Sequence, residues 1–289
     1  MAIAITGASG QLGSLVIEAL LEKGVDPRDI VAVARTPEKV AASGVVVRTA
    51  DYEDADSLDQ ALAGVDKLLL ISGNEMGRRL LQHRNIIEAA RKAGVGYVAY
   101  TSLINADSSS LSIADEHRGT ERALAEAGIP YTVLRNGWYT ENFTAGVSEH
   151  VSSGFILGGA GAGRIAAATR RDFAEAAAAL LLAPAPGRVF ELGGSGFTLA
   201  EFARAVGEVS GSPVDYRDLT PDALLSALRE SGVPESVAKW RVATDDCIAR
   251  GALDTDSTDL AELLGRPTTA LTDAIAVGLS ANTSSPRRA

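Results

Sequence analysis

Three glycines near the start of the chain have a spacing that is typical of loops that hold phosphate groups. The segment Gly7-Ala8-Ser9-Gly10-Gln11-Leu12-Gly13 lies between an apolar run at residues 2–6 and the first helical stripe of apolar residues. In such a turn, backbone N–H groups approach a pyrophosphate, and the N-terminus of the next helix adds partial positive charge. The pattern G-x-x-G-x-x-G is looser than G-x-G-x-x-G and by itself also occurs in ordinary turns. Because it follows a first strand and opens a helix, it predicts a dinucleotide-binding site.

Arg35 follows the second predicted strand, at the position where NAD-binding proteins of this type carry an acidic residue. An acidic side chain there accepts a hydrogen bond from the ribose 2′-hydroxyl, whereas a guanidinium can bind a 2′-phosphate through two N–H groups. Lys39 or Arg48 could assist it. The sequence therefore predicts NADP as the cofactor, with a solvated surface charge as the alternative role of Arg35.

Polar and aromatic residues follow the other predicted strands. Ligands of open parallel sheets bind beyond the carboxyl ends of the strands, so these residues are expected to surround the cofactor. We expect the residues after the third strand to face the adenine, those after the fourth the ribose, and those after the fifth and sixth the nicotinamide. In that order they are Asp51 and Tyr52, then Ser72, Gly73 and Asn74, then Thr101, Ser102 and Leu103, and finally Arg135, Asn136, Gly137, Trp138 and Tyr139.

The chain lacks the Tyr-x-x-x-Lys pair that short-chain dehydrogenases use to move a proton. His117 lies on the helix where such a pair is expected, and it could supply a proton or orient the nicotinamide ribose. A helix histidine without a chemical role is the alternative. His117 and Tyr139 are the candidate catalytic residues. Because Cys247 is the only cysteine and the three histidines are far apart in sequence, no metal site is predicted.

An enzyme without its own acid needs an acceptor that takes up a hydride before a proton. A quinone meets this requirement because the anion formed by hydride addition is aromatic, and its proton can come from solvent. The protein then contributes proximity and orientation. Trp138, Tyr139, Asn142 and Phe143 are expected to hold such a flat acceptor, and a core position between two lobes is the alternative for Trp138.

The elements that would position these residues alternate along the first half of the chain. Short apolar runs alternate with amphipathic helical stripes, which predicts parallel strands joined by crossover helices. Helices are expected near residues 12–21, 78–93 and 113–127. The six predicted strands are residues 2–6, 30–34, 45–48, 67–71, 97–101 and 131–134.

Helix signals dominate after residue 134. Asp172 is predicted to start an alanine-rich helix, Thr198 and Glu201 form a capping box, and Thr220-Pro221 is an N-cap followed by proline. Strand-like runs are scattered here, at residues 189–192 and 214–216.

The predicted fold is an α/β doubly wound parallel sheet of the Rossmann type with a smaller, mostly helical C-terminal domain. In this prediction residues 1–139 form the NADP-binding domain, to which residues 187–193 could add a strand. Residues 140–281 form the second lobe, which binds substrate, and residues 282–289 form a flexible tail.

Composition excludes several classes of protein. The 289 residues include 27 basic and 37 acidic side chains, and a net charge of −10 without basic runs argues against nucleic-acid binding. No apolar stretch approaches the ~20 residues of a membrane span, and the first residues do not resemble a secretion signal. We expect a cytoplasmic protein that binds a small molecule rather than a membrane. The oligomeric state is not predicted.

A series of motifs resembles the bacterial NADPH:quinone oxidoreductases of the NmrA-like, atypical short-chain dehydrogenase group, which includes triphenylmethane reductase. The likeness covers nearly the whole chain and continues in ATR at 168–170 and GRPTT at 265–269. The other motifs are ITGASGQLG at residues 5–13, VARTP at 33–37, ADY at 50–52, LLLIS at 68–72, QHRN at 82–85, YTSL at 100–103, ADEH at 114–117 and LRNGWY at 134–139.

This resemblance implies an NADPH-binding Rossmann domain, a smaller C-terminal domain and a cleft for a quinone. Where the group has a second serine, this chain has Gly73, whose backbone can serve equally well. The cofactor positions implied by the resemblance are Gly7, Ala8, Ser9, Gly10, Gln11, Leu12, Arg35, Ser72, Gly73, Thr101, Ser102, Asn136, Gly137, Trp138, Tyr139, Thr140, Glu141 and Arg170.

Two further functions fit the same motifs. NmrA-like proteins can bind the cofactor and signal through a partner without turnover, so a redox-sensing regulator is the main alternative. Reduction of another substrate, such as a triarylmethane dye or an aromatic ether, is a third. The compact length favours the reductase of quinones or similar flat electrophiles.

Overall fold

A computed structural model describes residues 1–40 and 44–283. Seven parallel strands form the main sheet in the order β3-β2-β1-β4-β5-β6-β8. The strand order reverses between β1 and β4, and such a switch leaves a crevice beyond the carboxyl ends of the strands. The predicted Rossmann-type sheet is confirmed. Its strands are β1 (Ile3–Thr6), β2 (Ile30–Ala34), β3 (Val46–Thr49), β4 (Lys67–Leu70), β5 (Tyr97–Leu103), β6 (Tyr131–Asn136) and β8 (Val189–Leu192).

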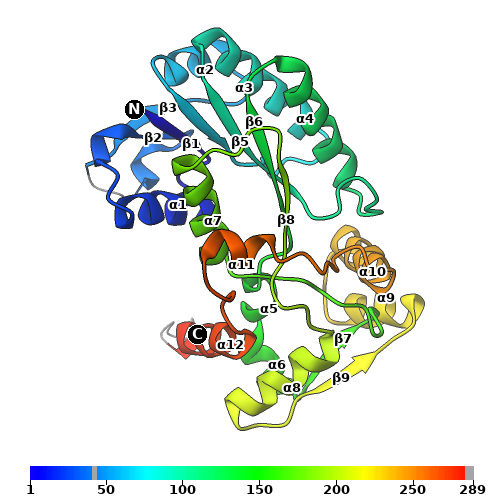
Figure 1. Cartoon of the computed structure of the whole chain (residues 1–289). Helices are drawn as coiled ribbons and strands as arrows, with labels where there is room; N and C mark the ends of the chain where they lie inside the picture. Colours follow the sequence, from blue (N-terminus) through cyan, green and yellow to red (C-terminus); the bar gives the residue numbers. More distant parts are fainter. Residues whose placement is uncertain (41–43, 284–289) are drawn as a thin grey trace.

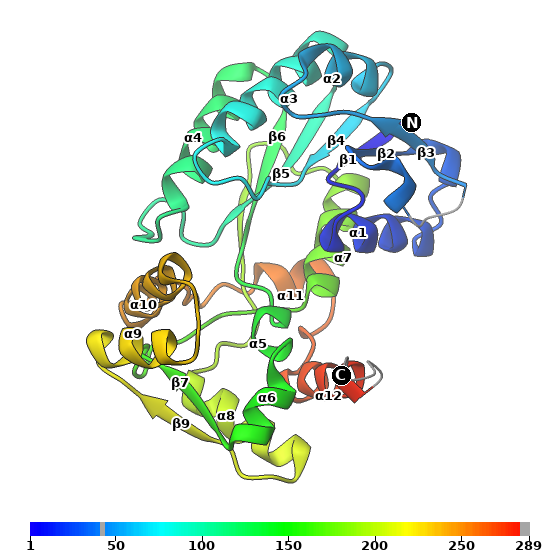
Figure 2. The ribbon, with the colours of Figure 1, turned by 180° about the vertical axis from the view of Figure 1, so that it is seen from behind.

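Helices cover both faces of this sheet (Figures 1 and 2). α1 (Gln11–Glu22) and α7 (Arg170–Leu182) pack together on one face, around a core that includes Ile5 and Phe173. α2 (Ala55–Leu62), α3 (Arg79–Ala93) and α4 (Ala114–Ala127) cover the other face, around Leu68 and Tyr100. Because both faces are covered, most of the strands are apolar along their whole length.

Local signals explain most helix ends. α3 ends at Gly94 and α4 at Gly128, as predicted. The capping box of Thr198 and Glu201 starts α8 (Leu199–Ser210), also as predicted. The predicted start of α7 was wrong: Thr169, not Asp172, is the N-cap, and its hydroxyl accepts the Asp172 N–H at 3.1 Å. The Asp172 carboxylate lies inside the first turn and is fully buried.

The second lobe is mostly helical and has its own hydrophobic core, which includes Phe197, Phe202 and Ile275. It contains one strand pair, β7 with β9, of which β7 was not predicted. Two short 3₁₀ turns, Pro27–Asp29 and Pro37–Lys39, flank β2 in the first lobe. The second lobe comprises α5 (Glu141–Thr144), α6 (Val147–Ser153), β7 (Phe155–Gly158), α8, β9 (Asp215–Asp218), α9 (Pro221–Glu230), α10 (Glu235–Ala249) and α12 (Leu271–Thr283).

The chain returns to the sheet after it has entered the second lobe. α7 packs on α1, β8 pairs with β6, and α11 (Asp259–Leu264) packs on α7 and β8. Residues 140–281 therefore do not all lie in the second lobe, because an apolar α7 and β8 are needed to cover and extend the sheet. The tail predicted for residues 282–289 overlaps α12 by two residues, and the rest of it lies outside the described residues.

Candidate active site

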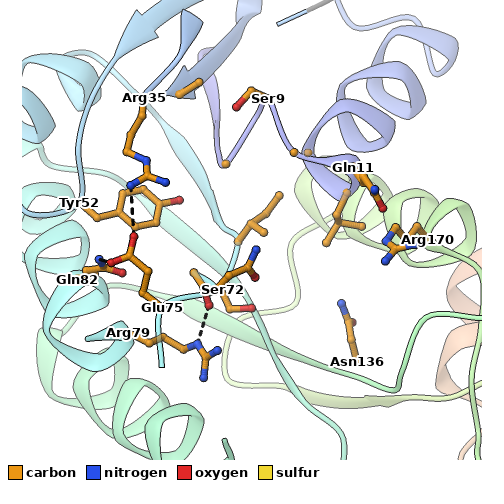
Figure 3. A pocket seen from close by; sticks show the side chains of 18 of the residues that line it. Ser9, Gln11, Arg35, Tyr52, Ser72, Glu75, Arg79, Gln82, Asn136 and Arg170 are labelled. Atoms are coloured by element: carbon orange, nitrogen blue, oxygen red, sulfur yellow. Dashed lines mark hydrogen bonds and ion pairs between the residues drawn. The ribbon is translucent and has the colours of Figure 1, made fainter. Parts of the chain in front are cut away.

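A cavity of about 840 Å³ lies at the carboxyl edge of the sheet, beside the strand-order switch. Residues that end or follow β1, β2, β3, β4, β5 and β6 line it together with residues of α3, α4 and the start of α7. Figure 3 shows Arg35 and Tyr52 at one end and Gln11, Arg170 and Asn136 at the other. The cavity is thus where the topology predicts a ligand.

The glycine loop shapes one wall of the cavity. Gly7 has φ of +61°, which side chains rarely adopt, and a Cβ atom on Gly13 would lie 2.4 Å from the Gly7 carbonyl oxygen. These two glycines allow α1 to begin directly against the loop. Its N-cap, Gly10, offers no side-chain cap, and no acidic residue occupies the first turn. The N–H groups of this helix end can therefore bind an anion such as a diphosphate.

Arg35 stands at one end of the cavity with its side chain 65% exposed. Its Nη1 donates to Glu75 Oε1 at 3.3 Å. Lys39 also lines the cavity. Arg48 does not, so the prediction that it could assist Arg35 was wrong. The Arg48 Nη1 instead donates to the carbonyl oxygens of residues 61 and 63 at 2.8 and 2.7 Å, because its place on β3 turns it toward the end of α2.

Hydrogen bonds from β5 and α3 hold the loop after β4 in place. Thr101 Oγ1 accepts the Ser72 N–H at 2.9 Å, and His83 Nε2 accepts the Gly73 N–H at 3.0 Å. Arg79 Nε donates to the Gly73 carbonyl oxygen at 2.7 Å. Ser72 and Gly73, which were predicted to lie at the cofactor site, line the cavity. Thr101 was also predicted there, but it only supports the loop and does not line the cavity.

His117 lines the cavity and is a neutral imidazole. Burial, with a smaller contribution from the nearby Arg79 guanidinium, lowers the pKa of His117 to about 3. Its Nδ1 lies 2.8 Å from the hydroxyl of Tyr100, whose pKa is raised by burial. This hydrogen bond can run in either direction, depending on which ring nitrogen of the neutral imidazole carries the proton. His117 can therefore donate a hydrogen bond, but it does not carry an acidic proton near neutral pH.

The opposite end of the cavity contains Asn136, Tyr139 and Arg170. Asn136 is 6% exposed, and no described residue bonds its buried Oδ1. The Arg170 guanidinium lies 4.4 Å above the Tyr139 ring, and its Nη2 donates to Asn142 Oδ1 at 3.2 Å. Glu141 orients this residue by accepting the Arg170 N–H at 2.9 Å. Burial raises the pKa of the Tyr139 hydroxyl, so it stays protonated.

Aromatic side chains of the second lobe pack behind Trp138, which is part of the cavity wall. Trp138 lines the cavity and stacks on Trp240 of α10, with ring centroids 6.1 Å apart and planes inclined by 10°. Trp240 is 44% exposed. Phe143 was predicted to hold the flat hydride acceptor. It instead packs edge-to-face on Phe197 and Phe202 and does not line the cavity. The sequence gives no signal that Trp240 joins Trp138, because the two are about a hundred residues apart.

Most of the predicted site residues meet at this one cavity, although their roles stay predictions. Six predicted residues do not line it, namely Ala8, Thr101, Arg135, Thr140, Glu141 and Phe143. Arg135 instead pairs with Asp107, Glu121 and Glu191. Four residues that were not predicted also line it, namely Glu75, Arg79, Gln82 and Ile113. They lie in a loop, in the first turn of α3 or just before α4, and the prediction considered only residues that follow strands. The predicted residues that line it are Gly7, Ser9, Gly10, Gln11, Leu12, Arg35, Asp51, Tyr52, Ser72, Gly73, Asn74, Ser102, Leu103, His117, Asn136, Gly137, Trp138, Tyr139, Asn142 and Arg170.

Comparison with known proteins decides the family. Residues 7–184 match a protein family described as NAD(P)H-binding. The chain belongs to this NAD(P)H-binding family. It is 48% identical to Quinone oxidoreductase 2 of Escherichia coli (strain K12) over 278 residues, which cover 94% of this chain and 97% of the relative.

Solved structures agree with this assignment. The chain matches the NADPH-dependent quinone oxidoreductase QOR2 of Escherichia coli, complexed with NADPH, with a TM-score of 0.91, 47% identity and coverage of 95% and 99% of the two chains. It matches triphenylmethane reductase of Citrobacter sp. with a TM-score of 0.92, 38% identity and coverage of 97% and 100%. The resemblance inferred from the motifs is confirmed.

The residues present fit a dinucleotide. The end of α1 has no side-chain cap, which suits a diphosphate. The buried Asn136 Oδ1, which no described residue bonds, fits an amide or hydroxyl donor of a dinucleotide. Among residues 1–40 and 44–283, no helix is long and apolar enough to cross a membrane.

Proposed function

We propose that this protein is an NADPH-dependent reductase that transfers a hydride to a quinone or a similar flat electrophile. The arrangement of the cavity carries the proposal. The Arg35 guanidinium lies at one end and Asn136 Oδ1, which no described residue bonds, at the other, as a bound NADPH requires. The histidine that lines the cavity, His117, has a pKa lowered to about 3 by burial and therefore supplies no acidic proton. The names of the two similar proteins, an NADPH-dependent quinone oxidoreductase and a triphenylmethane reductase, support flat conjugated acceptors.

The cofactor is proposed to lie along the carboxyl edge of the sheet. Arg35 would bind the 2′-phosphate, with Asp51 and Tyr52 near the adenine, and the end of α1 would bind the diphosphate. Asn136 would accept a hydrogen bond at the nicotinamide end, where Arg170 and Tyr139 also line the cavity. Bound in this way, NADPH supplies the hydride.

The protein's own contribution to the reaction is orientation. Neither His117, with a pKa of about 3, nor Tyr139, whose pKa is raised by burial, changes its protonation between pH 5 and 9. A quinone does not need such a group, because solvent can protonate the aromatic anion left after hydride addition. Trp138 and Asn142 would hold the acceptor beside the nicotinamide.

We further propose a cytoplasmic location, a first domain of residues 1–139 completed by α7 and β8, and a second lobe that carries the acceptor half of the site. An acidic chain with a net charge of −10 supports the view that nucleic acid is not a partner.

The proposal is tested by NADPH oxidation with a panel of quinones, with NADH as the cofactor control. Rapid turnover that is confined to NADPH supports the reductase. Tight NADPH binding in a parallel titration, without turnover on any acceptor, would overturn it in favour of a cofactor-sensing protein.

A further inference from the structure

The Arg35 guanidinium is already paired with a carboxylate. Glu75 lies on the loop between β4 and α3, and its Oε1 accepts from Arg35 Nη1 at 3.3 Å. Figure 3 shows this pair across the end of the cavity, beside the Tyr52 ring. A dinucleotide whose 2′-phosphate binds Arg35 therefore meets Glu75 at the same guanidinium.

The loop holds Glu75 in this position. Arg79 Nε fixes the Gly73 carbonyl oxygen at 2.7 Å, and Glu116 Oε1 accepts the Gly77 N–H at 2.9 Å, so both ends of the loop are tied to α3 and α4. Gln82 Nε2 donates to Glu75 Oε2 at 3.1 Å. The contact with Arg35 thus belongs to a built arrangement rather than to a freely moving surface side chain.

The two carboxylate oxygens have separate partners. If the contact between Glu75 Oε1 and Arg35 is broken, Glu75 Oε2 still accepts the hydrogen bond from the Gln82 amide. Arg78 Nη1 also lies 3.8 Å from Glu75 Oε2. The carboxylate is 40% exposed, so water can reach it as well. Displacement from Arg35 therefore leaves Glu75 solvated and partnered, and a phosphate can replace it without breaking the loop.

We propose that Glu75 is a built-in competitor for the 2′-phosphate on Arg35 and that it weakens the binding of NADPH. The proposal rests on the function proposed above, in which Arg35 binds that phosphate. A phosphate monoester carries a charge of about −1.5 to −2 near neutral pH. It must displace one negative charge from Arg35 and then remain close to that charge. Glu75 therefore reduces selectivity for the phosphorylated cofactor, whereas a cofactor with a plain 2′-hydroxyl is little affected.

The test is a calorimetric titration of the Glu75→Gln protein with adenosine 2′,5′-bisphosphate, which carries the 2′-phosphate, and with adenosine 5′-monophosphate, which lacks it. The bisphosphate should bind about 5- to 50-fold more tightly than to the unmodified protein at low salt, as expected for removal of one like charge a few ångströms away. The gain should shrink at high salt. The monophosphate affinity should change less than about two-fold.

Glu53→Gln is the matched control. Glu53 Oε1 accepts from the same Gln82 at 3.1 Å, and Glu53 pairs with Arg78, but among the described residues it forms no hydrogen bond or ion pair with Arg35. This variant removes a neighbouring negative charge and should change bisphosphate affinity by much less than Glu75→Gln. Equal gains in both variants would overturn the specific role of Glu75.

Two further variants distinguish a failure of the Glu75 proposal from a failure of the function proposed for Arg35. Glu75→Ala must tighten bisphosphate binding as well, and unchanged or weaker binding in both Glu75 variants, with melting temperatures near that of the unmodified protein, contradicts the proposal. Arg35→Gln tests the underlying function: if it leaves bisphosphate affinity unchanged, the assignment of Arg35 fails. If it weakens binding while the Glu75 variants bind no more tightly, only the role of Glu75 fails.

Discussion

At the scale of single residues, we predict that Arg35 decides which cofactor the cavity accepts. Replacement of Arg35 by Asp removes the phosphate partner and adds an acceptor for a ribose 2′-hydroxyl. We expect NADPH affinity to fall about 10- to 100-fold, as for the loss of a charge-assisted hydrogen bond, and NADH to become the preferred cofactor. Titrations with both cofactors measure this change. Unchanged NADPH affinity would contradict the role of Arg35.

The protonation state of His117 is a second prediction at this scale. Because burial lowers its pKa to about 3, the imidazole is neutral throughout the working range. The single-turnover rate of NADPH oxidation should therefore be flat from pH 5.5 to 8. A rate that rises or falls through pH 6.5 would show that an ordinary histidine takes part as an acid or base. His117→Gln should keep the flat profile, because an amide can still donate a hydrogen bond.

At the scale of secondary-structure elements, α10 does not line the cavity, but its Trp240 stacks on Trp138 of the cavity wall. Trp240 extends the aromatic wall of Trp138 toward solvent. Trp240→Ala should raise the KM for large aromatic acceptors about 3- to 10-fold, which corresponds to a lost aromatic pair. The kcat with a small benzoquinone should stay the same. Val237→Ala, on an exposed face of the same helix, is the control and should change neither value.

A buried carboxylate ties the start of α7 to the segment before α12. Asp172 accepts from the Thr269 N–H at 3.0 Å and pairs with Arg266 at 2.9 Å. Asp172→Ala should lower the free energy of unfolding by about 2 to 3 kcal/mol, because it leaves the buried Thr169 hydroxyl, which donates to Asp172 Oδ2 at 2.8 Å, without its acceptor. Urea denaturation measures the loss. Glu175→Ala removes a half-buried partner of the same Arg266 and should cost less than about 1 kcal/mol.

At the scale of the whole molecule, neutral histidines link stability to pH. Burial lowers the pKa of both His83 and His117 to about 3, from an ordinary value of 6.5. The unfolded chain takes up these protons below pH 6.5 and the folded protein does not, so this stabilisation is complete above pH 6.5 and is lost toward pH 3. Between pH 7.5 and 5.5 the free energy of unfolding should fall by about 1.4 kcal/mol for each histidine.

His83→Gln tests this linkage. The amide can keep both contacts of His83, to Thr120 and to the Gly73 N–H. The variant should lose less stability between pH 7.5 and 5.5 than the unmodified protein, by about 1.4 kcal/mol. Equal losses in urea denaturation of the two proteins would mean that His83 is not held neutral.

The sequence predicts the fold well because its signals are local. Apolar strands, glycine helix ends and the capping box at Thr198 depend on neighbours within a few residues, and the structure confirms them. Strand ends also predict which residues meet at the cavity, since the carboxyl ends of parallel strands share one edge. Contacts between distant segments are beyond such patterns: Glu75 with Arg35, and Trp240 with Trp138, depend on how loops and lobes pack.

The central claim is that the chain holds NADPH in one orientation and passes its hydride directly to a quinone. It is tested with NADPH that carries deuterium stereospecifically at either of the two hydrogens on C4, followed by mass analysis of the NADP⁺ formed with a quinone. We predict loss of deuterium from one stereoisomer and full retention in the other. Loss from both stereoisomers, or no oxidation, would contradict the account.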